Sequence, residues 1–131
     1  LDEFAARVNA AGKLQVETDF FGLEERLSDI QEISLYRISQ EWVNNVIKYS
    51  HASKVTIQIT RDVNELTLLI EDDGTGFNLA ELVNGKGNGW RNMNSRANLI
   101  KGELEVDTTP NIKGNALIVN VPTSVEETVP G

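Results

Sequence analysis

A chain of 131 residues, 40% hydrophobic and 24% charged, suits one globular domain and is long enough to bury a proper core. Its formal net charge of -8 argues against broad binding of nucleic acid or anionic membranes, because phosphate-rich partners need a basic surface. The absence of cysteine excludes disulfides, thiolate metal sites and cysteine nucleophiles, and the sequence holds no apolar run long enough to span a membrane and no signal peptide.

Hydrophobic periodicity divides the chain into helices and strands. In chain order it predicts helix 1–12, strand 13–20, helix 30–49, strands 54–61 and 65–72, helix 90–102, and strands 103–109 and 115–122. Ser28 or Asp29 could cap the second helix, Gly102 follows the last one, and the turn at 62–64 predicts a hairpin. We therefore expect an α+β two-layer sandwich, in which helices cover one face of a mixed, mostly antiparallel sheet.

Two segments carry no predicted strand. Residues 73–89 form a long glycine-rich connection with about one helical turn near 79–82, and so long a loop in a compact domain usually has a function. The tail 123–131 is expected to be disordered. The chain starts at Leu1 rather than Met, so we expect it to be a piece of a longer protein.

A polar stripe runs along the helix predicted at 30–49. Five side chains fall within one wedge of about 100°: Arg37, Glu41, Asn44, Asn45 and Lys48. The remaining surface is covered by Leu35, Tyr36, Ile38, Trp42, Val43, Val46, Ile47 and Tyr49, so most of the helix should be buried.

Two adjacent asparagines cost helix stability, which raises the question of what they do. An amide oxygen, with a carboxylate one turn before it and an ammonium one turn after it, would suit a site for Mg²⁺ and phosphate. The alternative is an ordinary solvent-facing stripe, and taken alone the stripe favours that alternative.

The segment EDDGTGF (71–77) ends a predicted strand in a carboxylate followed by glycines. Asp72 could accept a hydrogen bond from a ligand amine, and Gly74 and Gly76 would let a flat ligand approach the backbone. The alternative is a plain Asp-Gly turn after a strand. A calcium loop does not fit, because the EF-hand spacing and its terminal glutamate are missing.

The segment GKGNGWRNM (85–93) leads a glycine-rich loop into a helix N-terminus, which favours anion binding. It is neither a Walker A loop, since the GKS/GKT ending is missing, nor G-x-G-x-x-G, since Trp90 stands at the third glycine. Lys86, Arg91 and Arg96 could add positive charge. The alternative is a flexible surface loop.

Together these segments are more specific than any one of them. E-x-x-x-N-x-x-K on a helix, D-x-G-x-G after a strand and G-x-G before a helix follow one another in an order that resembles the Bergerat-fold ATP-binding domain. Histidine kinases, DNA gyrase, MutL-type repair proteins and large heat-shock chaperones share this domain. The resemblance covers residues 1–122 and is closest to sensor kinases of the nitrate-sensor and degradation-regulator type. It is carried by LYRISQEWVNNVIKYSHASKVTIQI (35–59) and GNGWRNMNSRANLIKGELEV (87–106).

The resemblance implies roles for the polar stripe. Asn45 would be the Mg²⁺ ligand through its side-chain oxygen, and Glu41 would orient a metal-bound water or act as a base. Lys48 would contact phosphate oxygens, and Asn44 would lie beside the site. His51, the only histidine, follows the helix and is expected to be exposed or to cap the helix end.

The resemblance also implies an adenine pocket and a lid. Asp72 would hydrogen-bond the adenine amino group directly and through water, above a floor shaped by Gly74 and Gly76. Gly87 and Gly89 would let the lid fold over the triphosphate. The chain departs from many relatives in two places. Asn88 replaces a leucine between the lid glycines, and Asn115 replaces a threonine that joins the water network at adenine, where asparagine could still hydrogen-bond.

The implied function is to bind Mg-ATP and to donate its γ-phosphate to a histidine on a separate dimerisation domain of a two-component sensor kinase, for relay to a response regulator. Residues 1–11 would be the end of the linker helix from that domain. The parent would be a homodimer, and this domain would be cytoplasmic even if an anchor holds the parent in the inner membrane. Alternatives are a stand-alone anti-sigma-factor-like serine kinase on the same fold, a gyrase-, MutL- or chaperone-type ATPase module, and a binding module without activity.

Overall fold

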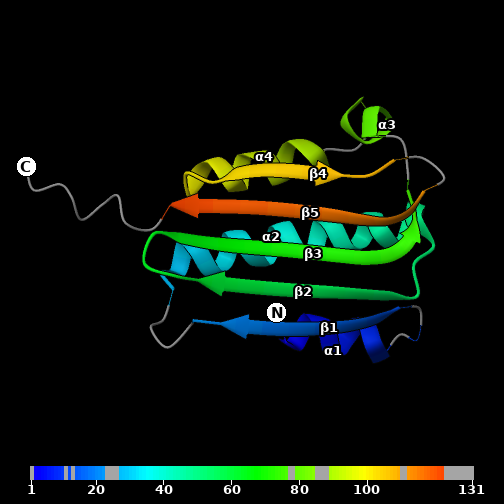
Figure 1. Ribbon diagram of the computed structural model, residues 1–131, viewed down its shortest axis with the longest axis horizontal. Helices are drawn as coiled ribbons and strands as arrows, with labels where there is room; N and C mark the ends of the chain where they lie inside the picture. Colours follow the sequence, from blue (N-terminus) through cyan, green and yellow to red (C-terminus); the bar gives the residue numbers. More distant parts are fainter. Residues whose placement is uncertain are drawn as a thin grey trace, which may run out of the picture.

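Hydrogen-bonded helices and strands account for most of the chain in the computed structural model, which describes residues 2–10, 12, 14–22, 27–76, 79–84, 89–109 and 112–122. Figure 1 shows the elements in chain order: α1 (Asp2–Ala10), β1 (Gln15–Phe21), α2 (Asp29–Asn45), the π-helical segment η1 (Val46–Ser50), β2 (Lys54–Arg61), β3 (Glu65–Thr75), α3 (Leu79–Asn84), α4 (Gly89–Leu99), β4 (Glu103–Asp107) and β5 (Lys113–Pro122).

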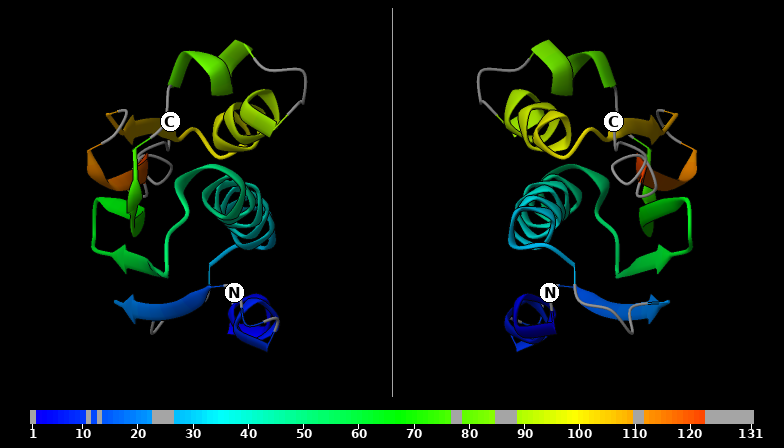
Figure 2. Two further views of the ribbon diagram at one scale, coloured as in Figure 1. Left: turned by 90° about the vertical axis from the view of Figure 1, so that its right-hand side faces the viewer. Right: turned by 90° about the vertical axis from the view of Figure 1, so that its left-hand side faces the viewer.

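The five strands form one sheet in the order β1-β2-β3-β5-β4. β1 pairs parallel with β2, and the other neighbours are antiparallel. Figure 2 shows α1, α2 and α4 side by side over one face of this sheet. The predicted α+β two-layer sandwich with a mixed, mostly antiparallel sheet is therefore confirmed, and so is the hairpin between β2 and β3.

Strand alternation determines which side chains form the core. Every second residue of the central strands faces the helices, while its neighbours face away from them. Trp42, Ile38 and Val43 of α2 are fully buried between the sheet and α4. Each such side chain contributes about 1.5–3 kcal/mol on burial, so α2 is the main helix anchored on the sheet.

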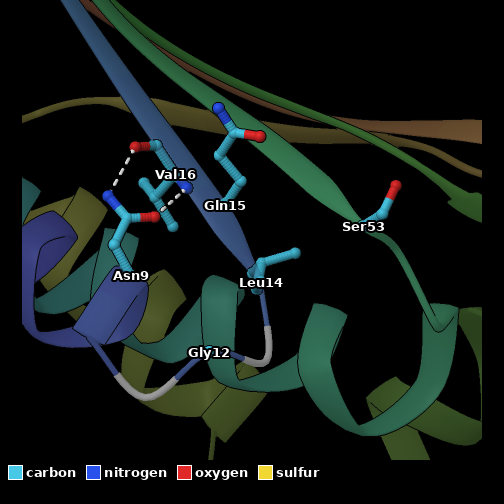
Figure 3. Close-up of a pocket in the computed structure, with 6 residues that line it drawn as sticks. All are labelled: Asn9, Gly12, Leu14, Gln15, Val16 and Ser53. Atoms are coloured by element: carbon cyan, nitrogen blue, oxygen red, sulfur yellow. Dashed lines mark hydrogen bonds between the residues drawn. The ribbon is translucent and has the colours of Figure 1, made fainter.

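The side chain of Asn9 in α1 forms hydrogen bonds with the backbone of the edge strand β1. The Asn9 amide donates from Nδ2 to the carbonyl of Val16 at 3.1 Å and accepts at Oδ1 from the Val16 N–H at 2.7 Å. Figure 3 shows this two-way pairing at the side of a pocket. The pocket has a volume of about 570 Å³ and is lined by Asn9, Gly12, Leu14, Gln15, Val16 and Ser53. Phe4 also packs edge-on against Tyr36 of α2, at 6.0 Å between ring centroids. Thus α1 joins both layers.

The helix ends follow local chemistry. Ser28 is the cap of α2, and its reciprocal bonds with Gln31 form a capping box, which confirms one of the two predicted caps. At the end of α4, Lys101 rather than Gly102 takes the left-handed conformation, with φ 59°. Gly102 packs closely against β5: a Cβ there would lie 3.0 Å from Cγ2 of Val121, so that side chain would have to shift.

The predicted end of one strand is wrong, and the predicted disordered tail is not covered by the structure. β3 continues to Thr75 through an irregularity after Asp72, whereas the sequence predicted that the strand ends at Asp72. The predicted tail, 123–131, lies outside the described residues. Among the helices that are described, none combines the length and apolar character needed to cross a membrane.

Candidate functional site

The predicted site residues gather at one end of the molecule. The end of α2 with η1, the end of β3 and the starts of β5 and α4 all lie at the right-hand side of Figure 1. Their side chains come from segments that are up to about 70 residues apart in the chain, because antiparallel pairing returns β5 to the end of β3. The sheet therefore assembles one site from all three motifs.

Asp72 is the buried acid of this site, with 7% of its surface exposed. Its Oδ2 faces three donors: the Gly74 N–H at 3.0 Å, Nδ2 of Asn115 at 2.9 Å and the Ser50 hydroxyl at 3.1 Å. The Ser50 hydroxyl has one hydrogen, which it shares between Asp72 and the Val46 carbonyl at 3.0 Å. Oδ1 of Asp72 is buried and has no partner among the described residues. A buried carboxylate oxygen without a donor is costly, so Oδ1 is the atom on which a ligand donor would act.

Asn115 lies opposite Asp72 in the register of β3 and β5. Its Nδ2 donates to Asp72 and also to the Thr75 carbonyl at 3.2 Å, and its Oδ1 accepts from the Thr108 hydroxyl. Asn115 is 4% exposed. The structure therefore brings this residue to the predicted adenine site, but its contacts there are with protein.

The two glycines of the segment after Asp72 are required by close approach. A Cβ on Gly74 would lie 2.3 Å from the Ser50 carbonyl oxygen, and one on Gly76 would collide with the Thr109 carbonyl. The Gly76 N–H donates to Ile112 at 2.7 Å. Backbone therefore passes next to backbone on both sides of this segment, so any larger residue would push β3 away from its neighbours.

The polar stripe of α2 divides into exposed and buried parts. Arg37, Asn44 and Lys48 are exposed, as an ordinary solvent-facing stripe requires. Asn45 is different, since it is 7% exposed and its Nδ2 has no partner among the described residues. Glu41 lies one turn before it and is half-buried. The buried asparagine beside a carboxylate is the part that an exposed stripe does not explain.

The helix changes its hydrogen-bonding pattern directly after Asn45. Residues Val46–Ser50 form a π-helical turn, a local widening that is frequent at functional sites. It leaves Ser50 fully buried, and the Ser50 hydroxyl reaches Asp72. His51 ends the turn in a left-handed conformation, with φ 53° and ψ 37°, and is exposed. This confirms its predicted place at the helix end.

The lid segment reaches the polar stripe at the start of α4. An ideal Cβ on Gly89 would lie 2.5 Å from Oε2 of Glu41. Farther along α4, Arg91 is exposed and Arg96 is half-buried. Lys86, Gly87 and Asn88 lie outside the described residues. The structure therefore joins the last lid glycine, Gly89, to the predicted site.

Glu41 and Asn45 are suited to a divalent cation of the Mg²⁺ type. They are four residues apart and so neighbours on one helix face, and both offer oxygen ligands. Within the described part of the chain, no three His, Cys, Asp or Glu side chains cluster to hold a metal ion. Mg²⁺ takes few protein ligands and shares the rest with phosphate and water, so this donor pair fits it.

Three contacts of the site escaped the sequence analysis. Ser50 and Thr108 bind Asp72 and Asn115, as described above. Asp73 accepts from the Ser53 hydroxyl at 2.7 Å and from the backbone N–H groups of Ser53 and Lys54. These bonds, the Ser53 hydroxyl first and the Lys54 N–H next, lower the pKa of Asp73 to about 2. The doubled acid of EDDG was the available signal for Asp73, while nothing local marked Ser50 or Thr108.

Comparison with known proteins assigns the chain to a family of ATPases. The family model of histidine kinase-, DNA gyrase B- and HSP90-like ATPases matches residues 30–125. The signal transduction histidine-protein kinase/phosphatase DegS of Brevibacillus brevis is 35% identical over 112 residues, which cover 86% of this chain and 28% of DegS. UhpB of Salmonella typhimurium, another histidine-protein kinase/phosphatase, is 35% identical over 99 residues, covering 76% of this chain and 19% of UhpB. The chain thus spans less than a third of each of these curated relatives.

Solved structures show the same fold. The histidine kinase domain of the blue-light activated histidine kinase of Erythrobacter litoralis EL346 superposes with a TM-score of 0.72 and 17% identity, over 97% of this chain and 65% of that one. The mycobacterial sensor histidine kinase MprB superposes with a TM-score of 0.66 and 22% identity, over 92% of this chain and 90% of that one. At these identities the likeness is one of fold.

Proposed function

Because the chain belongs to the family of histidine kinase-, DNA gyrase B- and HSP90-like ATPases, we propose that it is the catalytic domain of a sensor histidine kinase. It binds Mg-ATP and donates the γ-phosphate to a histidine of a separate dimerisation domain. The observation that carries this proposal is the buried Asp72, whose Oδ2 faces three donors while Oδ1 has none among the described residues.

The free oxygen of Asp72 selects for adenine. A carboxylate oxygen accepts hydrogen bonds only, and the 6-amino group of adenine is a donor. Guanine would place its 6-carbonyl oxygen there, acceptor against acceptor, and leave Oδ1 unsatisfied. Gly74 keeps the backbone after Asp72 close to Ser50 and Ala52, which supports the carboxylate in its position.

The polar stripe supplies the phosphate side of the site. Asn45 would hold Mg²⁺ through its side-chain oxygen, and the bound ion would neutralise charge on the phosphates of ATP. Lys48, which is exposed, would contact phosphate oxygens. Gly89 would let the start of α4 follow the triphosphate, with its N–H groups directed at anionic oxygens.

The transfer itself needs positioning more than covalent help from this domain. The bond from the γ-phosphorus to its bridging oxygen breaks, a bond to an imidazole nitrogen of the acceptor histidine forms, and ADP leaves. Glu41 would orient a metal-bound water or act as a base. The curated relatives are named as histidine-protein kinases, which supports this reaction over phosphorylation of serine by a stand-alone regulator.

The remaining parts of the proposal concern the whole protein. The acceptor domain makes the parent a homodimer, the phosphoryl group passes on to a response regulator, and this domain works in the cytoplasm. Residues 1–11 continue from the acceptor domain, and 1–122 form the catalytic domain. These statements rest on the resemblance to sensor kinases described in the sequence analysis.

Calorimetric titration of the protein with Mg-ATP tests the adenine assignment. Asp72→Asn exchanges an acceptor for a donor and should weaken binding at least about tenfold, while Asp19→Asn on the exposed side of β1 should leave it unchanged. Unchanged binding by Asp72→Asn, with thermal unfolding showing that it is folded, contradicts the assignment.

In the full-length parent, Asn45→Ala should abolish Mg²⁺-dependent autophosphorylation. Normal autophosphorylation by this variant would contradict the metal role of Asn45.

A further inference from the structure

We infer that Asn115, supported by Thr108, is a positioning residue that holds Asp72 with Oδ1 directed at the base and does not itself bind nucleotide. This inference rests on the proposed function of Asp72. It assigns to Asn115 a task different from that of the threonine in related domains, which joins the water network at adenine.

The hydrogen-bonding capacity of the amide carries the argument. An asparagine side chain has two donor hydrogens, both on Nδ2. One is used on Oδ2 of Asp72 at 2.9 Å and the other on the Thr75 carbonyl at 3.2 Å. No hydrogen remains for a ligand or for water, and the residue is 4% exposed. A threonine has one donor hydrogen and could not serve both acceptors.

Thr108 completes this arrangement from the neighbouring strand. The two acceptors facing Nδ2 determine which way the amide points, so its oxygen is directed at Thr108, just beyond the end of β4. The Thr108 hydroxyl donates to this oxygen. Without that donor, a buried amide oxygen would lose its partner, and the amide would no longer be held in one rotamer.

The orientation of the Asp72 carboxylate depends on Asn115. Three donors from three segments converge on Oδ2 of Asp72: Ser50 in η1, Gly74 in the irregularity of β3 and Asn115 in β5. Asn115 is the one that approaches from the opposite strand, so it fixes the plane of the carboxyl group across the sheet. Loosening it lets the carboxylate rotate, and Oδ1 spends less time where the 6-amino group would lie.

A comparison of two nucleotides separates positioning from general structural support. Purine riboside triphosphate has the sugar and phosphates of ATP but lacks the 6-amino group, so it cannot use Oδ1. Thr108→Val should weaken binding of ATP about three- to tenfold and leave binding of the analogue within about twofold. Thr108→Ser, which keeps the hydroxyl, should restore ATP binding. Thr109→Val, the same change at the exposed neighbour, should have no effect.

Asn115→Thr, the residue common in relatives, should show the same selective loss for ATP. Equal loss for both nucleotides in Thr108→Val, or full ATP affinity in that variant, overturns the inference. If the wild-type protein binds ATP more tightly than the analogue, either of these Thr108→Val results overturns only the inference and not the proposed function. A wild-type protein that binds the analogue as tightly as ATP overturns the adenine role of Asp72 and this inference together.

Discussion

Gly89, the first residue of α4, lies directly against the carboxylate of Glu41, so that a Cβ would come within 2.5 Å of Oε2 and 2.9 Å of Cδ. Gly89 ends the glycine-rich lid segment, and Glu41 belongs to the polar stripe of α2. The contact therefore joins two motifs that are 48 residues apart in the sequence. It also makes the position of the Glu41 carboxylate depend on a missing side chain.

Gly89→Ala should impair phosphotransfer without unfolding the domain. The added methyl meets the flexible end of a glutamate, which can swing away, and alanine suits a helix, so the melting temperature should stay within about 3 °C. The displaced Glu41 should lower autophosphorylation of the full-length parent by roughly tenfold to a hundredfold. The rate of phosphoryl incorporation at saturating ATP measures this effect.

The double variant Glu41→Ala with Gly89→Ala provides the control. Once the carboxylate is gone, the methyl group has room, so Gly89→Ala should add almost nothing to the loss caused by Glu41→Ala. Effects that simply add in the double variant would mean that Gly89 acts through the lid backbone instead.

Gly74→Ala, unlike Gly89→Ala, should destabilise the fold. Its Cβ would lie 2.3 Å from the Ser50 carbonyl oxygen and 2.8 Å from the Ala52 nitrogen, and backbone atoms cannot swing aside. We expect a loss of about 1–3 kcal/mol in the free energy of unfolding, measured by urea denaturation, together with loss of ATP binding. Gly89→Ala is the matched control for stability. A Gly74→Ala protein as stable as the wild type would mean that β3 is free to shift.

Asp73 should contribute stability that disappears in acid. Its folded pKa is about 2, below the ordinary value of 3.8, so the contribution is present above pH 3.8 and is lost as the pH falls toward 2. Because water reaches this carboxylate, Asp73→Asn should lower the free energy of unfolding by only about 1 kcal/mol at pH 7. Unfolding curves at pH 7 and pH 2.5 measure the difference between variant and wild type. A difference of equal size at both pH values would contradict the assignment to the ionised carboxylate.

The sequence was sufficient for the fold because burial is periodic. Strands β2 and β3 alternate strictly, and the apolar side of α2 recurs at helical spacing, so their faces could be predicted before their neighbours were known. The motifs were also local: Asn45 follows Glu41 by one turn, and Gly74 follows Asp72 by two residues. Residues this close in sequence lie near each other in the structure, whatever tertiary arrangement is assumed.

What the sequence could not predict depends on changes of period and on register. The helical wheel placed Tyr49 on the apolar side of α2, and this was wrong, since Tyr49 is 52% exposed while Ser50 is buried. The π-helical turn rotates each residue through a smaller angle than an α-helix does, and no residue type announces it. The Thr108–Asn115–Asp72 chain likewise depends on how β5 pairs with its neighbours.

Asn9 provides a last prediction, about the edge of the sheet. Its amide forms two hydrogen bonds with Val16, one to the carbonyl and one from the N–H, which link α1 to β1. Asn9→Ala should therefore lower the free energy of unfolding by about 1–2 kcal/mol. It should also speed hydrogen exchange at the Val16 amide, which loses its acceptor at the open edge of β1.

Asn98→Ala on α4 is the control, because it removes the same side chain from another exposed helix position. Its stability should stay within about 0.5 kcal/mol of wild type. If Asn9→Ala unfolds like wild type but exchanges faster at Val16, the pairing holds only the local edge. If both measurements match wild type, the amide pairing contributes nothing, and α1 is held by other contacts such as the packing of Phe4 and Ala5 and the hydrogen bond from Arg7 to the Tyr36 hydroxyl.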